Sequence, residues 1–414
     1  MNRQTDIEGL LRRLTPQALG ALVRRYGHFD ACEDAVQEAL IAATERWPGD
    51  GVPDSPLGWL VTVASRRLTD QLRSDASRRR REDRISDQRA PTGFGQGIPD
   101  NDDQDEDDTL SLLFMCCHPA LSSASQLALT LRAVGGLTTA QIASAFFVPE
   151  STMAQRISRA KQTIRSSPVG FEEPSLGERH DRLQVVLHVL YLIFNEGYTA
   201  TSGRELLRTE LTTEAIRLTR AVYGALPGNG EVAGLLALML LTDARRPSRT
   251  RADGALIPLA EQDRTRWNRA AIEEGDALIT DALSNAPLGP YQLQAAIAAV
   301  HSEAATPEDT DWVQIAALYR LLSELEPNPM VTLNHAVAIA MVNGPAAGLA
   351  LLQPLDDDER MARHHRLHAV RAYLLEMNGE AAAALASYRT ASRLTTSTPE
   401  RRYLDGRAAN LSRT

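Results

Sequence analysis

Residues 136–165 read GLTTAQIASAFFVPESTMAQRISRAKQTIR, and they contain two short helical patterns separated by a turn. Thr138 or Thr139 can cap the first pattern, and Val148-Pro149-Glu150 separates it from the second. The small side chain of Ala143 lets two helices approach each other closely. The stretch therefore predicts a helix-turn-helix. Its inward-facing positions are Ile142, Ala143, Phe146, Met153, Ile157 and Ile164.

The outward side of the second helix is polar and basic. Residues 151–165 include Arg156, Arg159, Lys161 and Arg165 and no acidic residue. Arginine and glutamine side chains can pair with base edges in the major groove, while hydroxyl groups hold phosphate. We therefore predict a DNA-reading surface, although an ordinary helical hairpin would show the same apolar spacing. The predicted contacts are Ser151, Thr152, Gln155, Arg156, Arg159 and Lys161.

A second basic helix is predicted upstream, where residues 59–74 read WLVTVASRRLTDQLRS. At helical spacing, one side carries an aromatic ring, a hydroxyl and two arginines, a combination that suits stacking on bases and holding phosphates. The run of four arginines at 78–81 can extend the phosphate contacts. The alternative is an amphipathic helix with a solvated basic tail. The predicted contacts are Trp59, Thr62, Arg66, Asp70 and Arg73.

An acidic helix precedes this one, because residues 33–47 read EDAVQEALIAATERW. Val36, Leu40, Ala43 and Trp47 fall on one stripe and are expected in the core. The opposite face carries Asp34, Gln37, Glu38 and Ile41, and taken alone it is most simply a solvated surface.

The three stretches, taken in this order, resemble the sigma-70 family in its small extracytoplasmic-function (ECF) group. The resemblance covers about 10–166 and implies that DAVQEAL docks on core RNA polymerase. It further implies that WLVTVASRRLTDQLR melts and reads the −10 promoter element, and that the helix-turn-helix reads the −35 element. Many family members have Asn in the −10 helix where this chain has Arg66, so the −10 preference is not carried over.

We expect an all-α protein, with two small helical sigma domains at 5–84 and 109–166, the second a helix-turn-helix, joined by an acidic linker. The linker, 85–108, has no apolar periodicity and ends in an acidic run from Asp100 to Asp108. Such a linker leaves the two domains free to separate. The resemblance implies that it threads toward the RNA exit channel of the polymerase; the alternative is a solvated spacer.

The remainder predicts a helical extension domain at 180–299 and repeats resembling tetratricopeptide (TPR) repeats at 300–410. Asn343-Gly344 recurs as Asn378-Gly379, and a period near 34–35 residues is typical of stacked helix pairs. The stretch LYLIFNEGYTA (190–200) resembles the long extension of one ECF subgroup. We hypothesise that this extension regulates the sigma domains in cis, and that it binds an unknown protein or small molecule. Four side chains can line a pocket or simply pack between helices: Tyr191, Asn195, Glu196 and Tyr198.

The hexapeptide FMCCHP, 114–119, looks like a metal or redox site but is better explained as structure. Neighbouring helical positions point about 100° apart, so Cys116, Cys117 and His118 cannot easily share one metal ion. We expect Leu110, Leu113, Phe114 and Cys117 to form a buried stripe, and Ser123 with Gln126 to form a capping box. His364 and His368 have i,i+4 spacing, but surface histidines are the simpler explanation. We predict no metal site and no cofactor.

Composition sets the outer limits of these interpretations. Hydrophobic content is 43%, net charge is −9, and the three cysteines argue for a reducing compartment. No signal peptide or membrane-length apolar run is present, so we expect a cytoplasmic protein without membrane contact. Enzyme signatures such as Gly-rich phosphate loops are absent from the C-terminal half. The runner-up function is a helix-turn-helix transcriptional regulator with a sensory tail.

Overall fold

The computed structural model describes residues 3–83, 105–146, 148–167, 178–200, 202–203, 205–251 and 254–413. Within these ranges the chain is helical almost throughout, as the sequence predicts. Two compact units, Met1–Val189 and Leu190–Thr414, are distinguished by their internal contacts. The division falls inside helix α8 (Arg179–Tyr198), about ten residues beyond the predicted start of the extension at 180.

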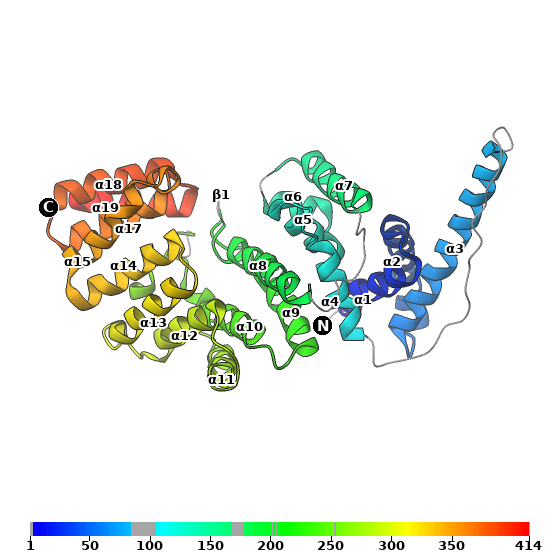
Figure 1. The fold of residues 1–414 in the computed structure, drawn as a ribbon, viewed down its shortest axis with the longest axis horizontal. Coiled ribbons are helices and arrows are strands. Elements are labelled where there is room, and N and C mark those ends of the chain that lie inside the picture. The colour runs from blue at the N-terminus through cyan, green and yellow to red at the C-terminus, as the bar shows by residue number, and fades with distance from the viewer. Residues whose placement is uncertain are drawn as a thin grey trace. The chain divides into compact units, whose positions relative to one another are not determined.

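The first unit is built from two groups of helices (Figure 1). The first group is α1 (Arg3–Tyr26), α2 (Phe29–Asp50) and α3 (Pro56–Asp83), which pack against one another. The second group is α4 (Asp105–Cys116), α5 (Ser123–Ala133), α6 (Thr139–Ala145) and α7 (Glu150–Ser166). Helix α4 also packs on α1, so the two groups share contacts.

The predicted linker differs from the structure at its C-terminal end. Residues 85–104 of it lie outside the described ranges, but 105–108 are already helical, because α4 begins at Asp105. The acidic run that suggested a linker therefore extends into the first turn of a helix.

The FMCCHP segment is structural, as expected. Leu110, Leu113, Phe114 and Cys117 are all buried, and burial raises the pKa of the Cys117 thiol to about 12. The predicted capping box is wrong, however. Ser122, not Ser123, occupies the N-cap of α5, and the amide of Gln126 instead donates to the carbonyl of His118 (3.0 Å). That bond ties the end of one helix to the start of the next, and it removes Gln126 from any capping role.

The second unit continues with helices stacked in sequence and one very short parallel pairing of strands, Ser202 with Thr396 and Gly203 with Ser397. Its α-helices after α8 are α9 (Thr209–Ala225), α10 (Gly230–Asp243), α11 (Arg269–Asn285), α12 (Pro290–Glu303), α13 (Trp312–Leu325), α14 (Pro329–Asn343), α15 (Pro345–Leu352), α16 (Glu359–Ala362), α17 (His365–Met377), α18 (Ala381–Leu394) and α19 (Thr398–Leu411). Strands β1 (Ser202–Gly203) and β2 (Thr396–Ser397) have two residues each.

The repeated Asn-Gly pair marks two similar helix endings. Gly344 follows α14 with φ +88°, and Gly379 follows α17 with φ +77°, a region that L side chains rarely adopt. In both places a further helix begins within two residues, α15 after Gly344 and α18 after Gly379. The recurrence thus has a common backbone cause, while the TPR-like character of 300–410 stays a prediction.

Candidate nucleic-acid interface

The helix-turn-helix is formed by α6 and α7, which pack on each other and, in the case of α7, on α5. Thr138 caps α6 through a complete capping box. Its hydroxyl accepts from Gln141 N (3.2 Å), and the Gln141 side chain accepts from Thr138 N (2.8 Å). The helix pair has an apolar core of five buried residues that the sequence predicts to be inward: Ile142, Ala143, Met153, Ile157 and Ile164. Phe146 is only half-buried.

The outward side of α7 divides into two parts. Ser151, Thr152, Gln155 and Arg159 are exposed, and Arg156 is half-buried. These five lie on the N-terminal two-thirds of the helix, where side chains and the helix terminus can meet DNA bases and phosphates. The sixth predicted contact, Lys161, lies elsewhere.

The Lys161 ammonium is engaged by the acidic start of α2. It forms an ion pair with Glu33 and lies 3.4 Å from an Asp30 carboxylate oxygen. Arg132 Nε contacts the other Glu33 oxygen at 3.2 Å, and Arg165 pairs with Asp30. Only 9% of the Glu33 side chain and 16% of the Lys161 side chain are exposed, so the centre of this charge cluster is largely desolvated, whereas Asp30 and Arg165 at its edge are more exposed.

This cluster corrects the expectation that the linker leaves the two helical groups free to separate. In the structure, α2 of the first group and α7 of the second are held together by opposite charges brought from 128 residues apart. Long-range pairs of this kind carry no periodic signal, and sequence patterns therefore miss them. In this arrangement the Lys161 ammonium contacts acidic side chains of α2 and does not face DNA.

The predicted contact face of α2 forms a continuous surface next to α3. Asp34 and Glu38 are exposed, Gln37 is half-buried, and Ile41 is 57% exposed, unusual for an isoleucine. Together with Arg67 and Gln71 of α3 they line a shallow cavity of about 440 Å³. Arg67 Nη1 donates to Glu38 Oε2 at 2.8 Å, with both side chains 53% exposed. An exposed apolar side chain ringed by polar groups suits docking of another protein.

The predicted DNA-reading side of α3 lies along one face of the helix. Trp59 and Thr62 are half-buried, whereas Arg66, Asp70 and Arg73 are exposed. The Trp59 ring contacts Trp47 of α2 edge-on, with centroids 5.5 Å apart, which fixes the aromatic end of this face. The spacings of three and four residues place all five side chains on one side. Helix α3 continues through the arginine run at 78–81.

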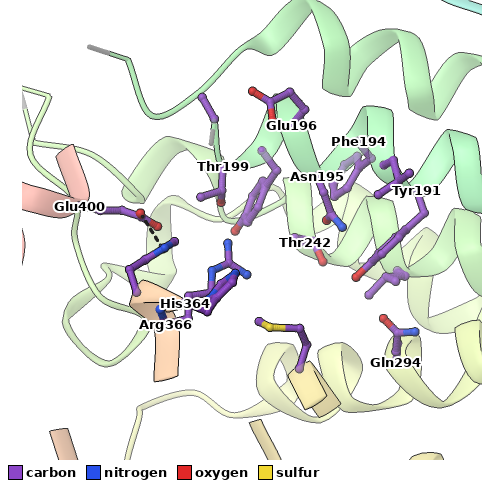
Figure 2. A pocket seen from close by; sticks show the side chains of 16 residues that line it. Tyr191, Phe194, Asn195, Glu196, Thr199, Thr242, Gln294, His364, Arg366 and Glu400 are labelled. Atoms are coloured by element: carbon purple, nitrogen blue, oxygen red, sulfur yellow. Dashed lines mark hydrogen bonds and ion pairs between the residues drawn. The ribbon is translucent and has the colours of Figure 1, made fainter. Parts of the chain in front are cut away.

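A separate cavity of about 540 Å³ lies in the second unit (Figure 2). Tyr191, Asn195, Glu196 and Tyr198 of α8 all line it, as the sequence suggested they can. Sequence reasoning missed the residues that α12, α17 and α19 bring to the same cavity, because they are 90 to 210 residues away. The missed polar residues are Gln294, His364, His365, Arg366 and Glu400.

His364 and His368 each contact a different backbone group. His364 Nδ1 accepts from the backbone N–H of Arg366 (3.3 Å), while His368 Nε2 lies 2.9 Å from the Ala362 carbonyl. In the described part of the chain no three metal-ligating side chains gather at one place. Likewise, none of the described helices combines the length and apolarity of a membrane span.

Three families match parts of this chain. Sigma-70 region 2 matches residues 10–79, and sigma-70 region 4 matches residues 111–164. A family of unknown function, DUF6596, matches residues 182–283. The first two matches coincide with the two helical groups of the first unit, and the third covers α8 to most of α11.

Among curated proteins, an uncharacterized protein of Rhizobium meliloti is 41% identical over 401 residues, spanning 94% of this chain and 92% of that protein. A probable ECF RNA polymerase sigma factor, SigI, of Mycobacterium tuberculosis is 29% identical over 146 residues. That match spans 35% of this chain and 50% of SigI. No solved structure matches the chain.

Proposed function

Because the chain belongs to the sigma-70 family, in its ECF group and with a long C-terminal extension, we propose that it binds core RNA polymerase and directs promoter-specific initiation of transcription. The observation that carries this proposal is the presence of three separate outward surfaces, on α2, α3 and α7, in one unit. A repressor or activator that only binds DNA needs the α7 surface alone. The proposed site of action is the cytoplasm, and the proposed role involves no bond-making by the protein.

Core polymerase would bind at the α2 surface. Asp34 and Glu38 offer exposed negative charge, which orients a basic partner and speeds association. Ile41 provides an apolar anchor whose burial in a complex would remove its 57% exposure. Gln37 lies between them and can pair with polar groups of the partner.

Promoter DNA would bind at the α3 and α7 surfaces. Around Trp59, aromatic and polar groups suit unstacked bases of a melted −10 element, with Arg66 and Arg73 holding phosphates. On α7, Gln155 and Arg159 suit base edges of a −35 element, with Ser151 and Thr152 near phosphate. Lys161 can contribute to DNA only after its pairs with Glu33 and Asp30 open.

The extension is proposed to regulate these surfaces in cis, together with an unidentified protein or small molecule. Its support is covalent attachment through a single helix, since α8 runs from the first unit into the second. Deleting 180–414 and measuring run-off transcription with purified core polymerase tests this part. Unchanged activity and unchanged response to signals would contradict regulation in cis and leave the core proposal standing.

Co-purification with core RNA polymerase tests the core proposal. The Ile41→Asp variant is expected to weaken binding to core enzyme at least tenfold, because a charge replaces the apolar anchor. Val52→Asp is the matched control, since Val52 is also exposed (44%) but lies outside the α2 surface. Failure of the unmodified protein to bind core enzyme, combined with DNA binding by itself, would instead support a helix-turn-helix regulator.

A further inference from the structure

The cavity of the second unit is built from two distant parts of the extension. One wall comes from α8, α10 and α12, through residues such as Tyr191, Leu238 and Gln294. The other comes from Met330 of α14, the start of α17 and Glu400 of α19. Its volume, about 540 Å³, is within the range of sites for small organic ligands.

One end of the cavity carries donors and positive charge. Arg366 is exposed there, and Figure 2 shows it beside His364 at the edge of the open space. His364 Nδ1 accepts a backbone N–H, and burial together with His365 and Arg366 lowers the pKa of His364. The imidazole is therefore neutral at pH 7 with its proton on Nε2, which makes it a hydrogen-bond donor. Both residues stand at the start of the 13-residue helix α17, whose dipole favours an anion.

A second guanidinium, that of Arg249, adds positive charge near this end of the cavity without lining it. Arg249 lies 3.6 Å from the centroid of the Tyr198 ring and donates to Thr199 Oγ1 at 3.1 Å, so it is fixed in place. One carboxylate, that of Glu400, also lines this end, but the two guanidinium groups of Arg249 and Arg366 outnumber it. Glu400 pairs with His365 (3.2 Å) and accepts from Thr395 (2.8 Å). Glu196 is a buried lining residue whose carboxylate points away from Arg366 in Figure 2.

The other end is apolar and aromatic, with a few neutral polar groups. Leu238 and Met330 line it beside the ring of Tyr191. In Figure 2 the side chains of Tyr191, Asn195 and Thr242 point into the same space as Arg366. Polar groups placed at a few points of an apolar wall fix the orientation of a ligand.

We propose that this cavity binds a small aromatic carboxylate, with the carboxylate at Arg366 and His364 and the ring against Tyr191, Leu238 and Met330. A guanidinium fork matches the two oxygens of a carboxylate, which makes the charged end selective. The inference concerns ligand binding by the extension. It does not depend on promoter recognition, and binding can succeed or fail separately from transcription.

The test uses the full-length chain and two probes of nearly equal shape, 2-naphthoate and its neutral amide, 2-naphthamide. Isothermal titration calorimetry should show 2-naphthoate binding at least about tenfold more tightly than the amide, since the amide lacks the charge that Arg366 pairs with. Absence of 2-naphthoate binding, or equal affinities for the two probes, would overturn the proposal.

Variants locate the site. Arg366→Met should weaken 2-naphthoate binding at least about tenfold, whereas Arg363→Met, an exposed arginine just before α17 that does not line the cavity, should change it less than about twofold. Asn195→Leu provides a second lining variant on α8, and it should also weaken binding. Circular-dichroism melting confirms that each variant is folded. Equal affinities of Arg366→Met and Arg363→Met would contradict the assignment.

Discussion

Buried charge is compensated in different ways at two places, one in each compact unit. In the first unit, Glu33 is surrounded by the cations Lys161 and Arg132, so opposite charges neutralise each other. In the second unit, Arg264 donates to the carbonyl oxygens of His301 (2.9 Å) and Ala304 (2.6 Å), and Arg245 donates to that of Ala298 (2.9 Å). These two guanidinium groups lie 5.0 and 5.3 Å from the centroid of the Trp267 ring.

The two arrangements differ in how far they depend on a charged partner. An ion pair between distant segments holds helices together only while both partners are charged. A guanidinium on backbone carbonyls is independent of any acidic partner, and it closes a helix end, because His301 O and Ala304 O lie at the C-terminus of α12. The first arrangement can be opened by competing charges, whereas the second does not depend on a paired carboxylate.

Arg264→Met should have the largest effect on stability. It leaves two partly buried carbonyl oxygens without their charged donor, at a cost of about 3 kcal/mol. Native-state hydrogen exchange of α12 amides measures this locally. Arg320→Met is the control, because Arg320 is 66% exposed and its ion pair is with Glu324 of the same helix. A similar, small change in both variants would show that the carbonyl contacts contribute little.

Glu33→Leu should cause the second-largest loss of stability, about 2 kcal/mol. The change leaves Lys161 and Arg132 close together without their shared anion, and their partial exposure reduces the cost below that of a fully buried pair. Amides of α2 and α7 should exchange faster with solvent. Glu45→Leu on the exposed side of α2 serves as control. Unaltered exchange in α7 would mean that the charge cluster does not hold the two helices together.

Acid should destabilise the second unit through His301. Burial, with Arg245 and Arg264 nearby, lowers the pKa of His301 to about 3, while the unfolded chain keeps the ordinary value of 6.5. Between these values the unfolded state binds more protons, so this contribution to stability is intact above pH 6.5 and is lost as pH falls toward 3. The slope is at most about 1.4 kcal/mol per pH unit. His301→Gln should make the unfolding temperature depend less steeply on pH. An equally steep pH dependence in the variant would contradict the role of His301.

Glu38→Gln should have the smallest effect on the free energy of unfolding. Glu38 and Arg67 form an ion pair like that of Glu33, but both side chains are 53% exposed, and exposed pairs contribute about 0–1 kcal/mol. Raising NaCl to about 0.5 M should remove even this difference, because salt screens exposed charges. If urea unfolding showed a loss of free energy as large as that of Glu33→Leu, exposure would not determine how much these ion pairs stabilise the fold.

Local patterns predicted much of this molecule. The helix-turn-helix, its Thr138 cap and the buried stripe through Cys117 follow from residues a few positions apart, and the structure confirms them. The contacts that join Glu33 to Lys161, and Tyr191 to Arg366 across one cavity, depend on segments over a hundred residues apart. The spacing of apolar and polar residues along the sequence does not reveal such pairs. The assignment of individual side chains to polymerase, −10 or −35 contacts stays a prediction.

Lys161 has one further consequence, which comes from its uniqueness. Of the 44 basic residues it is the only lysine, so it carries the only side-chain amine in the chain. An amine-reactive reagent therefore has one internal target, and that target sits in the charge cluster between α2 and α7. Its labelling rate, followed by mass spectrometry with or without core polymerase, is a chemical reporter of whether α7 is docked or released.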